Sequence, residues 1–461
     1  MANVTLVSHS PLLSGAERML VNLAVGLERG TRHRATVLIP EASLGPMPAT
    51  LASAGIKWQE APATRWYLFE DSQEAAEYAR HVLRSAEAYA DLYWQTKADV
   101  VVVNTLTNLE APLGARMAGL PYILWAHGIL DPGQIRRFDW LKTVADGIAL
   151  ESASRIVCCS SWTESHFRLL ARPGIVCTIP NWTDLDPRPI QRAASTRFCV
   201  LGTLERHKGI DIVIQAVRLL RDSGIEIGVD VYGDGPLGSS LQDLTRKLGV
   251  SDLVAFPGRT SNAGLVYAQA FATIVPSQIE PFGMVAIESM AAGTPVIAAR
   301  TGGLIDIVED MVTGLHFTPG DANDLAQKIR IMRETPGASK RFAQAGRNRV
   351  VERYDGRTSL GEFDRMLRQV EAEFAGYREA DPIGLNALRL LSAIDGEVIH
   401  PVAAVAVPSD AERELAAIRA STYWRMGVPL RRFLSGSPRL RNYLRGAARL
   451  TRRALTGRAP R

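Results

Sequence analysis

The chain has 461 residues, of which 46% are hydrophobic and 22% are charged, a composition typical of a globular protein with two or three domains. We find neither an apolar run long enough to span a bilayer nor a basic and then apolar leader, so we expect neither a membrane span nor a signal peptide. The net charge of +5 is uneven, because Pro429–Arg461 carries ten arginines and no acidic residue. The remainder of the chain is therefore mildly acidic.

The first 183 residues alternate short apolar runs with helical stretches, and continuous Val and Ile runs of this kind are typical of a parallel sheet covered on both faces. A helix is expected from about Ala16 to Leu27, and the capping-box pattern Asp71-Ser-Gln-Glu74 predicts the start of a second one. Residues 1–183 are therefore predicted to form a Rossmann-like domain. Its strands are expected at Val4–Val7, Thr36–Ile39, Val100–Val103 and Tyr122–Trp125.

A proline-containing segment of low apolar content, 184–196, is predicted to be a linker, after which the alternation restarts. Residues 197–355 are predicted to form a second doubly wound domain, with helices at Gly209–Arg221 and Gly283–Ala292. A ligand between two such domains would lie at the strand C-termini, facing the cleft. The strands are expected at Phe198–Leu201, Glu226–Tyr232, Leu253–Phe256, Thr273–Val275 and Pro295–Ala298. Four cysteines without zinc-ligand spacing are expected to be buried thiols.

The segment Glu280-Pro-Phe-Gly-Met-Val-Ala-Ile-Glu288 is the most informative part of the chain, because it places two carboxylates on either side of a helix start. Pro281 suits a first helical position, and Gly283 allows a ligand to approach the backbone closely. Free N–H groups at a helix start attract phosphate, so this segment could hold a diphosphate and sugar hydroxyls together. The alternative is an exposed helix with two solvated glutamates.

Further polar segments follow the predicted strands. Ser14-Gly-Ala-Glu17 follows the first, Trp125-Ala-His-Gly128 contains His127, and the loop after Gly202 contains Lys208, whose point charge suits a diphosphate. Gly233-Asp-Gly-Pro236 makes a tight turn, and Thr301-Gly-Gly303 is a close-approach loop or a simple turn. Each has a structural alternative: a turn, a structural histidine or a surface lysine.

The order and spacing of these segments resemble the family 4 glycosyltransferases of the GT-B fold, of the bacterial cell-surface polysaccharide type. The resemblance covers roughly Asn3 to Tyr377 and is densest over Pro276–Gly303. It implies two Rossmann-like domains facing a cleft, and a helix over 356–378 that crosses back to the first domain. It also implies transfer of a sugar from a UDP- or GDP-linked donor with retention of configuration, without a metal ion or a cofactor.

The resemblance assigns roles to individual residues. Glu280, His127 and Lys208 would be catalytic: Glu280 would hold the donor sugar, His127 would lie beside it on the acceptor side, and Lys208 would stabilise the leaving diphosphate. Glu288 would accept hydrogen bonds from the ribose. One departure is Thr203, where the family usually has arginine and where a threonine supplies no charge. The donor-binding residues so assigned are Gly15, Gly202, Thr203, Lys208, Gly233, Gly258, Arg259, Glu280, Phe282, Gly283, Met284, Val285 and Glu288.

The C-terminal extension, 379–461, ends in a basic segment that we predict to be an amphipathic helix on an anionic membrane surface. Nucleic-acid binding and a solvated extension are the alternatives, and we expect no nucleic acid. Ala420–Arg431 is similar to a segment of bacterial surface-polysaccharide proteins, which favours a glycan acceptor that is lipid-linked, as in lipopolysaccharide assembly. The protein would then be cytoplasmic and peripheral on the inner face of the membrane.

Two other functions are compatible with the same architecture. A nucleotide-sugar 2-epimerase shares the two domains but lacks the paired glutamates, and a non-catalytic nucleotide-sugar binding module is suggested by Thr203. A transferase releases free nucleotide only with an acceptor, an epimerase changes the sugar without one, and a binding module does neither.

Overall fold

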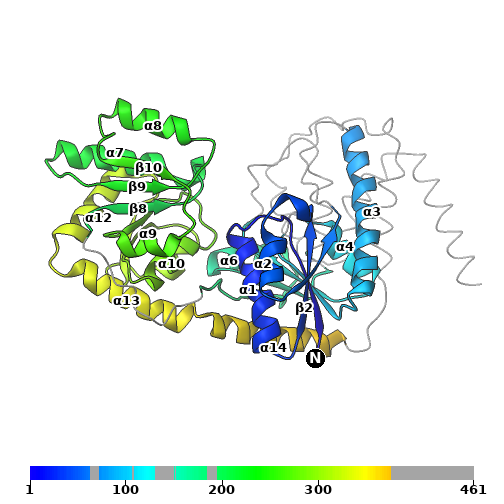
Figure 1. Ribbon diagram of the computed structural model, residues 1–461. Helices are drawn as coiled ribbons and strands as arrows, with labels where there is room; N and C mark the ends of the chain where they lie inside the picture. The colour runs from blue at the N-terminus through cyan, green and yellow to red at the C-terminus, as the bar shows by residue number, and fades with distance from the viewer. Residues whose placement is uncertain (63–71, 106–107, 130–149, 151, 184–194, 375–461) are drawn as a thin grey trace, which may run out of the picture.

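The computed structural model describes residues 1–62, 72–105, 108–129, 150, 152–183 and 195–374, which form two α/β domains joined side by side (Figure 1). The predicted extension over 379–461 lies outside the described residues, as does the predicted linker apart from its last two residues. Each domain is built around its own parallel sheet.

The first sheet has seven parallel strands in the order β3-β2-β1-β4-β5-β6-β7. All four residues of β4 are buried, and they alternate between two hydrophobic clusters, with Val100 and Val102 in one and Val101 and Val103 in the other. This is the pattern of a strand that is covered on both faces. The strands are β1 (Asn3–Val7), β2 (Arg34–Pro40), β3 (Lys57–Ala61), β4 (Val100–Val103), β5 (Tyr122–Ala126), β6 (Arg155–Cys158) and β7 (Val176–Thr178).

Helices cover both faces of this sheet (Figure 1). The cluster on one face contains buried residues of α1 and α14, and the cluster on the other contains Tyr89 and Tyr93 of α3 and Ala111 and Ala115 of α4. The helices are α1 (Gly15–Gly30), α2 (Met47–Ser53), α3 (Ser72–Gln95), α4 (Glu110–Met117) and α6 (Ser161–Leu170), with the short 3₁₀ turn η1 (Ala42–Leu44).

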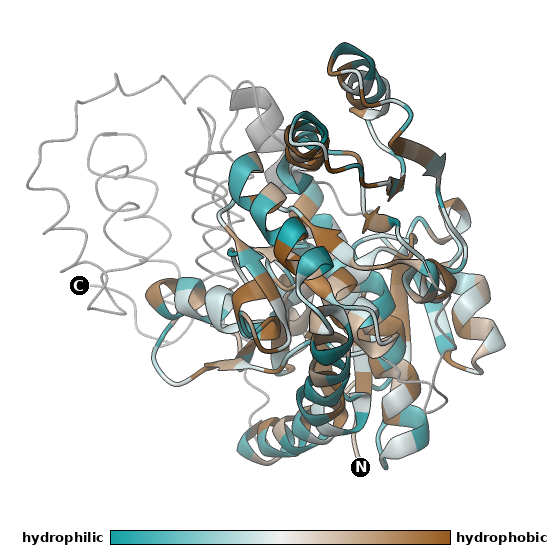
Figure 2. Cartoon of the chain, turned by 90° about the vertical axis from the view of Figure 1, so that its left-hand side faces the viewer, coloured by the Kyte–Doolittle hydropathy of each residue, from teal (hydrophilic) through white to brown (hydrophobic). Residues whose placement is uncertain are grey.

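The second sheet has six parallel strands in the order β10-β9-β8-β11-β12-β13. In Figure 2 the strands are largely brown and apolar, whereas teal hydrophilic residues lie along the helices. The strands are β8 (Phe198–Leu201), β9 (Val229–Tyr232), β10 (Val254–Gly258), β11 (Thr273–Val275), β12 (Val296–Ala299) and β13 (Gly314–Phe317). The helices are η3 (Arg206–Lys208), α7 (Ile210–Asp222), α8 (Gly238–Lys247), α9 (Ala263–Gln269), α10 (Met284–Ala291), α11 (Leu304–Ile307), α12 (Ala322–Glu334) and α13 (Ala338–Arg353).

The strand order reverses beside the first strand of each sheet. β1 lies between β2 and β4, and β8 lies between β9 and β11. In doubly wound sheets a ligand binds outside the carboxyl ends of the strands at such a switch point. The residues that follow β1 and β4, and those that follow β8 and β11, are therefore the ones in which to look for a site.

The last described helix, α14 (Gly356–Phe374), returns to the first domain along its lower side in Figure 1. Its Phe363 is fully buried and packs edge-on against Trp125 of β5, with ring centroids 4.7 Å apart. The two halves are also joined where Thr183 pairs with Asp355 in an isolated β-bridge. The end of the described chain is thus part of the core of the first domain.

Candidate functional site

Two helix N-termini, one from each domain, meet at the switch points. A Cβ atom placed on Gly15, the first residue of α1, would lie 3.8 Å from Cγ of Met284, the first residue of α10. Among the described residues, neither helix has a side-chain cap hydrogen bond at its start. The positive ends of two helix dipoles are therefore brought together, an arrangement that favours an anion.

The start of α10 differs from the expectation, because Pro281 is not the first helical residue. The helix begins at Met284 and its N-cap is Gly283, whose φ of 118° suits glycine and few other residues. Pro281 instead lies in a turn, and its carbonyl oxygen accepts a hydrogen bond of 2.6 Å from Ser160 Oγ of the first domain. The left-handed glycine, rather than the proline, sets where this helix starts.

Two further glycines, Gly302 and Gly303, contact the backbone beside that turn. A Cβ atom on Gly302 would lie 2.0 Å from the carbonyl oxygen of Glu280, and Gly303 N–H donates to the same oxygen at 2.9 Å. The Thr301–Gly303 loop therefore packs closely against other backbone of the protein, and the close approach of a ligand to it stays a prediction. The backbone that it approaches is the segment that carries Glu280.

Glu280 is bound by a lysine from a distant part of the chain. Lys208 Nζ lies 2.8 Å from Glu280 Oε2, and Ser277 Oγ donates to the same oxygen at 3.1 Å. Lys208 ends η3 and comes before Gly209, whose left-handed φ of 64° turns the chain into α7. Lys208 is thus part of a defined ion pair, which contradicts the interpretation of a solvated surface lysine.

Glu288 is bound by partners that the sequence did not suggest. The hydroxyl of the buried Tyr267, in α9, donates to Glu288 Oε2 at 2.9 Å. Burial, and then the Glu288 charge, raise the pKa of Tyr267 well above its usual value, so this hydroxyl stays protonated and donates. The other oxygen, Oε1, lies 3.1 Å from Arg18 Nη2 of the first domain. Both glutamates are therefore held in place rather than solvated.

His127 follows β5 and is held between two amides. Its Nε2 lies 2.9 Å from Asn104 Oδ1, and its Nδ1 lies 3.4 Å from Asn181 Nδ2. Asn104 Nδ2 donates to the carbonyl oxygen of Ala16 at 2.9 Å, which leaves Oδ1 as the acceptor. Nε2 of His127 therefore carries the hydrogen and Nδ1 accepts one.

The charge state of His127 follows from the same surroundings. Burial lowers the pKa of His127 to about 3, and the nearby His9 contributes to this decrease. Part of the side chain nevertheless reaches the surface. Among the described residues, its ring nitrogens lie against amide groups rather than against a carboxylate that would favour a proton. His127 is therefore neutral at physiological pH and acts as a fixed hydrogen-bonding group.

A carboxylate–imidazole pair lies beside it. His9 follows β1, and its Nε2 lies 3.1 Å from Oε1 of Glu17, a buried residue in the first turn of α1. Ser14 Oγ also bonds Glu17, which explains why this hydroxyl does not cap the helix. Burial lowers the pKa of His9, and the Glu17 charge opposes that change. No spacing along the chain indicates this pair.

The three glycine loops of the second domain lie together at the ends of β8, β9 and β10. A Cβ atom on Gly233 would lie 1.8 Å from the carbonyl oxygen of Gly202, and Gly233 N–H donates to the carbonyl oxygen of Gly258 at 2.9 Å. Thr203 and Arg259, the residues after the first and third of these glycines, are exposed. The loops therefore form one layer of backbone beside Lys208.

The other residues assigned to the donor lie at the start of α10. The Phe282 side chain is buried and packs against Tyr354, with ring centroids 5.9 Å apart, so only its backbone is available to a ligand. Val285 is half-buried, and Met284 packs against clusters of both domains. The side chains of this segment fix its position, and the one next to Gly15 is that of Met284.

A further contact ties this segment to the first domain. Ser161, the first residue of α6, donates to Asp306 through its backbone N–H at 2.8 Å and through its hydroxyl at 2.7 Å. The carboxylate of one domain thus completes a helix start of the other, where negative charge is favourable.

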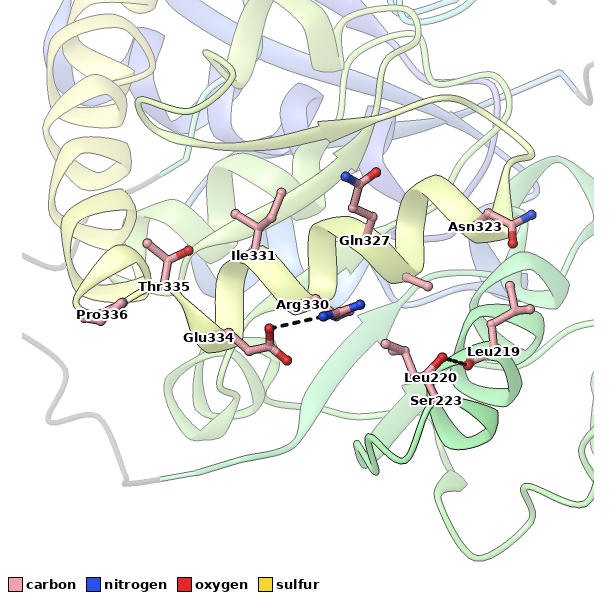
Figure 3. A pocket seen from close by; sticks show the side chains of 11 residues that line it. Leu219, Leu220, Ser223, Asn323, Gln327, Arg330, Ile331, Glu334, Thr335 and Pro336 are labelled. Atoms are coloured by element: carbon pink, nitrogen blue, oxygen red, sulfur yellow. Dashed lines mark hydrogen bonds and ion pairs between the residues drawn. The ribbon is translucent and has the colours of Figure 1, made fainter.

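A surface pocket of about 690 Å³ lies elsewhere, between α7 and α12 (Figure 3). Arg330 and Glu334 form an ion pair of 3.7 Å at its rim. Its lining, as far as the chain is described, includes none of the residues predicted for the site. The structure therefore separates this pocket from the converging glutamates.

The described ranges contain neither a cluster of metal-ligating side chains nor a membrane-spanning helix. Within residues 1–374, apart from the gaps named above, no three or more His, Cys, Asp or Glu side chains gather as a metal site. Over the same ranges, no helix has the length and apolarity needed to cross a bilayer.

Comparisons with known proteins match both halves of the chain. A family model described as Glycosyltransferase Family 4 matches residues 13–187, and one described as Glycosyl transferases group 1 matches residues 188–349. Glycogen synthase of Mycobacterium tuberculosis is 30% identical over 285 residues, which are 60% of this chain. The 2-deoxystreptamine glucosyltransferase of Streptomyces kanamyceticus is 27% identical over 53% of the chain and 70% of the relative. The chain spans 64% of the length of the glycogen synthase that it matches.

Solved structures share the arrangement of both domains. Anabaena HepE in complex with UDP-glucose has a TM-score of 0.67 at 22% identity and covers 80% of this chain and 100% of its own. Sucrose-phosphate synthase of Thermosynechococcus elongatus has a TM-score of 0.66 at 20% identity, over 81% of this chain and 100% of its own. At these identities the likeness establishes the fold, and the predicted two-domain GT-B architecture is confirmed.

Proposed function

Because the chain belongs to the family 4 glycosyltransferases, we propose that it moves a sugar from a nucleoside-diphosphate donor to a glycan acceptor. One observation carries this proposal. Two helix N-termini face each other, and the α10 start lies between two glutamates, Glu280 and Glu288, each of which forms an ion pair. An anion and a polyhydroxyl ligand have complementary partners there, the first in the helix amides and the second in the carboxylates.

The donor would occupy the space between the domains. Its diphosphate would accept hydrogen bonds from the α1 and α10 amides and from Lys208, and its ribose would donate to Glu288. Glu280 would receive the hydroxyls of the donor sugar. The glycine layer of Gly202, Gly233 and Gly258 would lie beside the nucleoside, where backbone without side chains allows close approach.

The chemistry would be a retaining, metal-independent transfer. The bond between the anomeric carbon and the diphosphate breaks, the acceptor oxygen bonds to that carbon on the same face, and the acceptor proton passes to the departing phosphate oxygen. Negative charge grows on the diphosphate, where preorganised Lys208 and helix dipoles stabilise it. Neutral His127 suits a hydrogen-bonding role beside the sugar rather than proton transfer.

The biological setting extends this proposal. A lipid-linked glycan of the cell envelope is the acceptor that we propose, with the arginine-rich segment Pro429–Arg461 binding the cytoplasmic face of an anionic membrane. UDP and GDP are the candidate nucleotides, and UDP is supported by a neighbour of the same fold that was solved with UDP-glucose.

The first experiment is a binding and turnover assay on the whole chain. UDP, GDP and their hexose conjugates are screened by thermal shift, because a bound ligand raises the apparent stability. Release of free nucleotide is then followed with and without membrane-derived glycolipid. A transferase releases nucleotide when acceptor is added, and the Lys208→Ala variant does so far more slowly. Sugar isomerisation without acceptor would instead identify an epimerase, and donor binding without either reaction a binding module.

A further inference from the structure

Arg18 reaches from the first domain into the site of the second. It lies in the first turn of α1, and its Nη2 is 3.1 Å from Glu288 Oε1 of α10. The arginine side chain is 46% exposed and the glutamate 15% exposed. An ion pair this open to solvent contributes about 0–1 kcal/mol to stability, so holding the domains together is a minor part of what it offers.

The position of Arg18 follows from the meeting of the two helices. It is three residues from Gly15, whose backbone approaches Met284, and it contacts a residue one turn into α10. The guanidinium group therefore lies beside the space between the helix N-termini. It has five N–H donors in a planar fork, and the Glu288 contact is made through one of its ends.

The charges around this space also call for a second cation. Glu280 and Glu288 place two carboxylates beside a site that the proposed donor fills with a diphosphate, and like charges at close range oppose binding. Lys208 offsets Glu280, and Arg18 offsets Glu288. Without Arg18, the partner left to the ribose-side carboxylate in the described part of the chain would be the neutral Tyr267 hydroxyl.

We propose that Arg18 is a diphosphate-binding residue, supplied by the first domain. It keeps its ion pair with Glu288 and donates its remaining N–H groups to the phosphates, so that the bound donor joins α1 to α10. This inference rests on the proposed function. It adds a ligand contact from the first domain, whose other contributions to the site are the start of α1 and the residues around His127.

The test compares ligands that differ only in phosphate content. Calorimetry on the full chain measures the affinity of the wild type and of Arg18→Gln and Arg18→Lys for the nucleoside, its monophosphate and its diphosphate, using the base that the wild type binds. A charge-assisted contact predicts that Arg18→Gln weakens diphosphate binding by about tenfold or more, monophosphate binding by less and nucleoside binding not at all. Arg18→Lys, which keeps the charge, is expected to recover part of the loss.

The matched control is Arg29→Gln, an exposed arginine in the last turn of the same helix, which is expected to bind all three ligands as the wild type does. An equal loss for all three ligands in Arg18→Gln would show that Arg18 acts only through Glu288 and would overturn the proposal, as would unchanged diphosphate affinity. If the wild type bound no nucleotide, the proposed function itself would fail, which is a different result from binding that ignores Arg18.

Discussion

The two glutamates of one short segment, Glu280 and Glu288, have different surroundings. Glu280 lies against an ammonium group and a serine hydroxyl, whereas Glu288 lies against a tyrosine hydroxyl and a guanidinium group. Each lies next to a cation and accepts a hydrogen bond from a second, neutral donor. Such doubly held carboxylates are preorganised acceptors, because a ligand hydroxyl finds them already oriented.

This arrangement predicts the effect of removing Glu288. Glu288→Ala would leave the ribose hydroxyls without their charged acceptor, and we expect nucleoside-diphosphate binding to weaken by about 10- to 100-fold, since a hydrogen bond to a charged group contributes about 1.5–3 kcal/mol. Calorimetry checks the value. Glu334→Ala, an exposed glutamate of α12, serves as the control. Affinity that is the same in both variants would remove Glu288 from the ribose site.

His127 gives a prediction about pH. Its pKa is about 3 in the folded protein and about 6.5 when unfolded, so below pH 6.5 the unfolded chain binds a proton that the folded one does not. The contribution of His127 to stability is complete above pH 6.5 and is lost as the pH falls towards 3. We expect wild-type thermal stability to fall more steeply between pH 6.5 and pH 4 than that of His127→Gln. Parallel curves would show that His127 is protonated in the fold.

At the scale of elements, backbone contact between loops decides the shape of the site. Gly233 has a φ of 142° and touches the carbonyl oxygen of Gly202, so the ends of β8 and β9 lie closer than any side chain would allow. The same principle operates where Gly302 meets Glu280. The glycines of these loops are therefore required for packing between the loops, in addition to any contact that they make with a ligand.

Gly233→Ala tests this packing. The added Cβ would overlap the Gly202 carbonyl oxygen in a conformation that costs alanine about 1–3 kcal/mol even without a clash, and we expect the melting temperature to fall by roughly 5 °C or more. Differential scanning calorimetry measures the change. Gly224→Ala also replaces a glycine of positive φ, in this case 74°, but with open space around it, and it serves as the control for a positive φ without an overlap. Equal losses in both variants would show that the loops separate freely.

The elements also show what the sequence could predict. The central strands β1, β4, β8 and β11 were predicted because each is a mostly apolar run that is buried along nearly its whole length. β3 was missed because four of its five residues are exposed at one edge of the sheet, and β7, whose three residues are all partly exposed, was missed at the opposite edge. An edge strand lacks the buried pattern that marks a central one.

Only part of the site was predicted from the sequence. The glutamates, Lys208 and His127 belong to local motifs, and the structure brings Lys208 to Glu280. Arg18 and Tyr267 were missed, because they meet Glu288 only through the docking of two helices, and no spacing along the chain records that contact. The predicted range of α10, Gly283–Ala292, agrees with the observed start within one residue, but Pro281 was wrongly given a first helical position, because the left-handed Gly283 cap decides where the helix begins.

At the scale of the whole molecule, the donor-side segment depends on both domains. Pro281 is bound by Ser160, Asp306 caps α6, and Arg18 pairs with Glu288. These contacts link the position of the α10 start to the position of the first domain. Domain closure and ligand binding are thus expected to be coupled, as in enzymes that exclude water on closing.

The arginine-rich end of the chain makes a prediction about the molecule as a whole. Removing Pro429–Arg461 takes away ten positive charges, each contributing about 1 kcal/mol near an anionic surface. We expect at least tenfold weaker binding to vesicles containing phosphatidylglycerol, with nucleotide affinity unchanged. Flotation assays measure the binding, and phosphatidylcholine vesicles are the control. Vesicle binding that survives the deletion would contradict the role of this segment.

The return of α14 has a consequence for synthesis on the ribosome. Phe363, Met366, Leu367 and Val370 complete the hydrophobic cluster that contains Trp125 and Trp182, although they are made after every strand of the second sheet. A nascent chain usually folds its N-terminal domain first. Here the domain that emerges first lacks part of its interior until its last helix has been translated, so the half that is made first is the half that is finished last.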